Sequence, residues 1–117
     1  MSRHDYALEK LTNAVYYMAT GPGPIKDRLY DAFVEMVALS ERDFPDDLRE
    51  EYRWIRAEPT KKEAKQRALV EGRVIEGAEG RLGATLRTMR IEKAQEIARR
   101  IYELAAKLEA LESESPR

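Results

Sequence analysis

The sequence predicts an all-α protein, a compact bundle of about five helices with an N-terminal antiparallel helix hairpin and a long C-terminal helix. Apolar residues recur at three- and four-residue spacing, which is typical of amphipathic helices. The pattern breaks at the five prolines, which interrupt helices: Pro22, Pro24, Pro45, Pro59 and Pro116. A chain of 117 residues is one domain by length, expected over residues 1–112 before a disordered tail at 113–117.

Residues 5–19 and 25–39 are expected to form the first two helices. The connector between them is short, so these helices should be antiparallel neighbours. Gly21 suits the left-handed position after a helix end, and Pro24 suits the first turn of the next helix. The connector lacks the lysine, the hydroxyl and the preceding strand of a phosphate-binding loop, so we interpret it as a helix–helix connector. The two apolar stripes comprise Ala7, Leu8, Leu11, Ala14, Val15 and Met18, then Ile25, Leu29, Ala32, Phe33, Met36 and Val37.

A third helix is expected from about Phe44-Pro45 to Ala57. Asp46 and Asp47 in its first turn favour the positive end of the helix dipole. Trp54, the only tryptophan, lies about 100° from the apolar stripe at the helical angle. That stripe comprises Phe44, Leu48, Tyr52 and Ile55.

The next stretch is the least regular part of the chain. Thr60 and Glu63 have the spacing of a capping box and predict a helix start. Four glycines follow, and each weakens a helix by about 1 kcal/mol relative to alanine: Gly72, Gly77, Gly80 and Gly83. Apolar residues keep helical spacing beyond them, so we expect a helix over 79–89, with 72–78 either a loop or frayed helix.

The last helix, expected over 91–112, has the most regular pattern. Its apolar residues repeat at four- and three-residue intervals, as in a heptad seam: Ile97, Ile101, Leu104, Leu108 and Leu111. Alanines widen this stripe to about half the circumference, which exceeds what one neighbouring helix would cover. The seam therefore predicts either an interface between two copies or a core helix with two neighbours in the same chain.

Few residues here are suited to catalysis or metal binding. The chain has no cysteine, and its single histidine, His4, lies near a terminus that we expect to be mobile. Zinc sites draw on cysteine and histidine, and general bases are most often histidines. The acidic residues 46, 47, 50 and 51 fit an acidic first turn and a solvated surface. We therefore expect no catalytic residue, no metal and no cofactor, and do not expect an enzyme.

Aromatic residues away from the apolar stripes indicate a contact surface. Tyr6, Lys10, Asn13 and Tyr17 share the side of the first helix away from its stripe. Tyrosine and tryptophan in such positions are typical interface anchors, so Tyr6, Tyr17 and Trp54 join the seam as candidate interface residues. The alternative is that a further helix of the same chain covers them.

Basic residues in the second half give a different hypothesis, binding to nucleic acid. Candidate anion or nucleic-acid contacts are Lys61, Lys62, Lys65, Arg67, Arg81, Arg87 and Arg90. Phosphate binding needs such cations on one face, whereas the three arginines scatter around their helix. The overall charge is −1, which disfavours this hypothesis. Residues 1–60 carry 8 basic and 12 acidic residues (−4), and residues 61–117 carry 13 and 10 (+3), an asymmetry that could orient association.

Residues 8–50 resemble a group of small uncharacterised bacterial helical proteins. The residues that carry the resemblance are Lys10-Leu11, Ala14-Val15, Thr20-Gly21-Pro22-Gly23, Ile25, Arg28-Leu29, Ala32-Phe33 and Phe44-Pro45. The resemblance implies a bacterial helical domain and no particular mechanism. Arg28 is the one polar member that helix packing does not obviously require.

Together these features predict a non-enzymatic protein–protein interaction module or small accessory subunit, homo-oligomeric in form. A nucleic-acid-associated regulator with a basic C-terminal surface is the alternative. The chain has no apolar run long enough for a membrane span, and its N-terminus lacks the apolar segment of a signal peptide. With zero cysteines, these features predict a cytoplasmic protein with no membrane partner.

Overall fold

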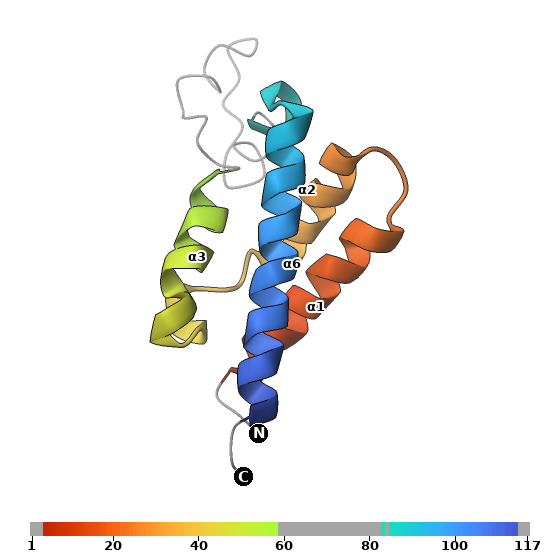
Figure 1. Ribbon diagram of the computed structural model, residues 1–117. Helices are drawn as coiled ribbons and strands as arrows, with labels where there is room; N and C mark the ends of the chain where they lie inside the picture. Colours follow the sequence, from red (N-terminus) through yellow and green to blue (C-terminus); the bar gives the residue numbers. More distant parts are fainter. Residues whose placement is uncertain (1–3, 59–82, 84, 115–117) are drawn as a thin grey trace.

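A hairpin of two antiparallel helices and a third helix surround the long C-terminal helix in the computed structural model (Figure 1). The structure describes residues 4–58, 83 and 85–114. Their helices are α1 (Asp5–Thr20), α2 (Ile25–Met36), the 3₁₀ helix η1 (Glu41–Asp43), α3 (Asp46–Ala57) and α6 (Ile91–Glu114). The all-α bundle, its N-terminal hairpin and its long C-terminal helix are confirmed. Thr60, Glu63 and residues 72–78 lie outside the described residues; of the helix expected over 79–89, residues 83 and 85–88 are helical.

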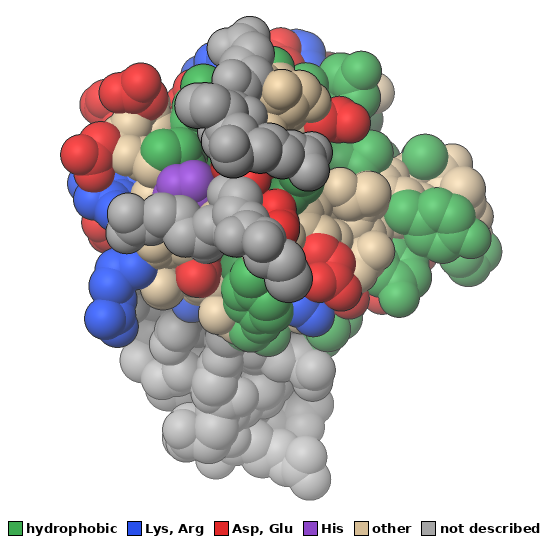
Figure 2. All heavy atoms as spheres, turned by 90° about the horizontal axis from the view of Figure 1, so that it is seen from below, with side chains coloured by type: hydrophobic (Ala, Val, Ile, Leu, Met, Phe, Trp, Pro, Cys, Tyr) green, Lys and Arg blue, Asp and Glu red, His purple; other side chains and the backbone are tan. Residues whose placement is uncertain are grey.

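The core is built around one stripe of α6, which contacts α1, α2 and α3. Five side chains of this stripe are fully buried: Ala94, Ile97, Ile101, Leu104 and Leu108. Burial of a leucine or isoleucine side chain stabilises the fold by about 1.5–3 kcal/mol. Buried alanines on α1 and α2 belong to the same cluster, and their small size lets the helices approach closely. Charged side chains of both signs lie on the surface among hydrophobic ones, as seen from below in Figure 2.

Arg28 stabilises the connector between α1 and α2 through two hydrogen bonds to backbone carbonyls. Its Nε donates to the Gly23 carbonyl at 3.0 Å, and its Nη1 donates to the Met18 carbonyl at 2.7 Å. The left-handed residue is Gly23, with φ of 88°, so the prediction for Gly21 is wrong. Gly21 is extended, and a Cβ there would lie 2.6 Å from the Tyr17 carbonyl oxygen and 3.2 Å from the Arg28 Cγ. Glycine is therefore required at position 21 because neighbouring atoms approach its Cα closely, and not because its backbone is left-handed.

The second helix ends earlier than its apolar pattern predicts. α2 stops at Met36, and Val37, expected in the core, is 54% exposed. Leu39 is buried instead because the turn after Met36 redirects the chain inward. A capping box between Ser40 and Asp43 then opens the short 3₁₀ helix η1 before α3.

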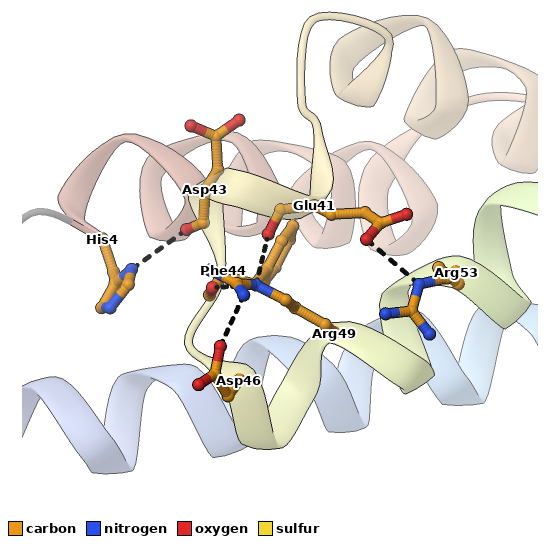
Figure 3. A network of polar contacts seen from close by, with 7 residues as sticks. All are labelled: His4, Glu41, Asp43, Phe44, Asp46, Arg49 and Arg53. Carbon is orange, nitrogen blue, oxygen red and sulfur yellow. Dashed lines mark hydrogen bonds and ion pairs between the residues drawn. The ribbon is translucent and has the colours of Figure 1, made fainter.

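A second arginine fastens the segment before α3, as Figure 3 shows. Arg49 Nε donates to the carbonyls of Glu41 (3.1 Å) and Phe44 (3.0 Å), and Arg53 pairs with the Glu41 carboxylate at 3.1 Å. Arg49 repeats the placement of Arg28, because each stands four residues after the N-cap proline of its helix and reaches the carbonyl just before that proline. Both arginines thus donate to carbonyls at the breaks between helices; the Glu41 carbonyl also accepts from the Phe44 amide at 3.1 Å.

His4 and Tyr52 also contact the segment between α2 and α3. His4 is half-buried, and its Nδ1 lies 3.1 Å from the Asp43 carbonyl oxygen, so the expected mobile histidine is instead in contact with the fold. The buried Tyr52 stacks on Phe44 with ring centroids 4.5 Å apart. Its hydroxyl donates to the Leu39 carbonyl at 2.7 Å, and Arg56 donates to the same carbonyl at 2.6 Å.

Arg28→Ala is expected to lower the free energy of unfolding by about 1–3 kcal/mol, because two carbonyls lose a charged donor. Arg28→Lys should restore only part of this loss, since an ammonium lacks the planar fork of the guanidinium. Urea unfolding followed by circular dichroism measures both variants. The control is Lys26→Ala, expected within about 0.5 kcal/mol of wild type. If Arg28→Ala matches Lys26→Ala, the connector does not depend on the arginine.

Burial raises the pKa of Tyr52 above its ordinary value of 10.0, although the hydrogen bond from Arg56 opposes the shift. The folded state therefore keeps this proton to higher pH than the unfolded chain. The associated stability is complete below about pH 10 and is lost as the pH rises further. Tyr52→Phe should lack this part of the alkaline decline, measured by urea unfolding at about pH 9 and about pH 11. Tyr16→Phe, at an exposed tyrosine, should keep the decline; equal slopes in all three proteins would contradict the assignment.

Candidate interaction surface

The heptad seam of α6 lies inside the chain's own core. Four of its five predicted interface residues, Ile97, Ile101, Leu104 and Leu108, have no exposed surface. Leu111 alone is partly exposed, at 38%. Three neighbouring helices cover the wide apolar arc. A second copy could therefore reach the four buried side chains only by displacing one of these helices. Packing within one chain thus explains why the residues of the seam are apolar.

Trp54 is also engaged within the chain. The side chain is half-buried against the core. The Arg100 guanidinium lies 4.4 Å and the Lys93 ammonium 5.3 Å from the centre of its ring. Lys107 and Glu51 form an ion pair of 2.8 Å across the same junction. Trp54 therefore joins α3 to α6.

The predicted tyrosines of α1 remain accessible. Tyr6 is 45% exposed and Tyr17 is 40% exposed. Tyr16, which the sequence analysis did not select, is 63% exposed and meets the Tyr17 ring edge to face, with centroids 6.0 Å apart. Position 16 lies about 180° from Ala7 at the helical angle, a direction that could have identified it. We call these three residues, Tyr6, Tyr16 and Tyr17, the tyrosine face.

The residues between these tyrosines bind α1 to α2. Asn13 Nδ2 donates to the Glu35 carboxylate at 2.9 Å, and Lys10 Nζ pairs with the same carboxylate at 3.4 Å. Lys10 also lies 5.7 Å from the centre of the Tyr6 ring. The tyrosine face therefore lies along the outer side of the hairpin, beside a polar junction between its helices. Figure 2 shows hydrophobic side chains gathered on the hairpin side of the molecule, with acidic side chains near them.

Most of the basic set proposed for nucleic acid lies outside the described residues: Lys61, Lys62, Lys65, Arg67 and Arg81. Arg87 and Arg90 are exposed. Arg87 lines a mainly apolar cleft of about 510 Å³ with Tyr30, Leu86 and Ile91. These two arginines do not by themselves form a basic surface.

Comparisons with protein-family models, curated proteins and solved structures give no match for this chain. Within the part of the chain that the structure describes, no group of three or more histidine or acidic side chains is placed to hold a metal ion. None of the helices described there is long and apolar enough to cross a membrane. The fold and surface define the class of this protein as a small helical bundle with an accessible tyrosine face.

Leu108→Asp is expected to unfold the protein and not merely to alter its mass, because a carboxylate would enter a fully buried site. A loss above about 3 kcal/mol is expected for an unpaired buried charge. The matched control is Leu111→Asp, one helical turn further on, which should stay folded within about 1 kcal/mol of wild type. Circular dichroism and light scattering distinguish the outcomes; a folded Leu108→Asp variant of altered mass would restore the seam as an interface.

Proposed function

We propose that this protein is a non-enzymatic protein-interaction module that binds a protein partner through the tyrosine face of α1. The observation that carries the proposal is the exposure of Tyr6, Tyr16 and Tyr17, between 40% and 63%, on the side of α1 away from the core. Tyrosines offer a large apolar ring and a polar hydroxyl, and they are enriched at interfaces.

The Tyr16–Tyr17 pair favours a binding role over a merely solvated surface. Each ring has only two rotatable side-chain bonds, so it loses little conformational entropy when a partner covers it. The edge-to-face contact between the rings restricts them further before binding. Preorganised aromatic anchors of this kind often supply much of the affinity of an interface.

We extend the proposal to an accessory subunit of the bacterial cytoplasm. The resemblance of residues 8–50 supports the bacterial origin, and the zero cysteines fit a reducing compartment. A homo-oligomer remains part of the proposal, but it would use the tyrosine face, because the α6 seam is enclosed by three helices. Light scattering of the purified chain decides whether the partner is a second copy.

A photo-crosslinking benzoylphenylalanine at position 16 is expected to capture a partner in the source cell. The control is the same group at position 102 on α6, where the tyrosine is 59% exposed. Once the partner is identified and purified, the double variant Tyr16→Glu/Tyr17→Glu should weaken its binding at least about tenfold, because two anchors are lost. Tyr102→Glu should bind as wild type. Equal capture from both positions, or unchanged binding by the double variant, would remove the tyrosine face from the proposal.

A further inference from the structure

Acidic residues of α2 border the tyrosine face. Arg28 contacts the Met18 carbonyl and Glu35 contacts Asn13, so the antiparallel register places residue 31 level with residues 15–17. Asp31 and Glu35 are four residues apart and share one side of the helix. Asp27, one turn earlier, lines the cleft that also contains Lys26 and Arg87. Glu35 contacts α1 from that side, so Asp31 lies beside the Tyr16–Tyr17 pair.

Two of the three cations of the hairpin are already engaged, and the third, Lys26, lines the cleft beside Tyr30. Lys10 pairs with Glu35 beside the Tyr6 ring, and both donating groups of Arg28 bind backbone carbonyls. Asp27 and Asp31 are exposed. Among the described residues, no cation lies within ion-pair distance of either carboxylate. Residues 5–36 carry five acidic and three basic side chains, a net charge of −2.

We infer that the partner of the tyrosine face is a basic helix of another protein, with an arginine or lysine side chain that meets Asp31. Arginine suits both parts of this surface, because its guanidinium binds carboxylates and also stacks on aromatic rings. A helix suits the shape, because a helix hairpin can receive a third helix along the junction of its two members. The inference rests on the proposed function and adds the chemistry of the partner.

The same charges disfavour two other occupants. A second copy that packed face to face would bring one hairpin of charge −2 against another. Nucleic acid would meet the carboxylate of Asp31 beside the tyrosines, and its phosphates would be repelled. Binding of either occupant at this face would overturn the inference.

The test uses the full-length protein and two synthetic amphipathic helical peptides of about 18 residues. The peptides share one set of apolar positions; one carries arginine at its polar positions and the other carries glutamate. Amide chemical shifts of the ¹⁵N-labelled protein give both the affinity and the location of binding. The arginine peptide should bind at least about tenfold more tightly, with shifts centred on Tyr16, Tyr17 and Asp31. This preference should shrink as sodium chloride rises, because salt screens exposed charges.

Two charge-reversal variants then distinguish a local effect of Asp31 on peptide binding from an effect of the protein's net charge. Asp31→Lys and Glu50→Lys each raise the net charge by two, and both positions are exposed. Asp31→Lys should weaken binding of the arginine peptide about fivefold, whereas Glu50→Lys on α3 should leave it unchanged. Thermal unfolding checks that both variants are folded.

The inference is overturned if neither peptide binds, if both bind equally, if the shifts centre elsewhere, or if the two variants weaken binding alike. The proposed function has its own test in the partner captured from position 16. If Tyr16→Glu/Tyr17→Glu weakens that partner and Asp31→Lys does not, the tyrosine face stands as a binding surface and the basic partner is rejected. If the double variant has no effect, both proposals fail together.

Discussion

The fold depends on the complete burial of one apolar stripe of α6. Ile97, Ile101, Leu104 and Leu108 are inaccessible to solvent only because α1, α2 and α3 all contact this helix. Removing any one neighbour would expose part of the stripe, and each side chain re-exposed would cost about 1.5–3 kcal/mol. The segments that place α1, α2 and α3 therefore contribute to stability even where they bury little surface themselves.

Two arginines fix the positions of these helices through the same hydrogen-bond geometry. Arg28 and Arg49 each follow an N-cap proline by four residues, and each guanidinium donates to the carbonyl that precedes the proline. Proline ends one segment and leaves nearby carbonyls without helical partners. The arginine from the next helix satisfies them, so each sharp change of chain direction is fixed by a side chain of the following helix.

Sequence periodicity and prolines predicted the helices well, because both signals act over a few residues. The role of Arg28 could not be predicted, since it arises from a contact with Met18, ten residues away and in another helix. The role of Gly21 depends on the path of the connector, which brings it against the Tyr17 carbonyl and the Arg28 side chain. The sequence could not decide between the two interpretations of the α6 seam for a related reason. A heptad stripe has the same spacing in a dimer as in a core helix, and only the number of neighbours in the fold distinguishes them. Tyr6 and Tyr17 could be placed off the apolar stripe from the helical period, but their exposure depended on which helices pack against the hairpin.

The arrangement that encloses α6 also determines what the molecule presents outside. α6 occupies the inner side of the hairpin, and α3 packs on α6, so neither covers the outer side of α1. The contacts between α1 and α2 engage Lys10 and Arg28, while Asp31 stays exposed. A chain that is nearly neutral overall, at −1, thereby acquires a locally acidic border beside its exposed tyrosines. The sign of the charge on this surface depends on which charged side chains are paired within the fold, and composition alone does not reveal it.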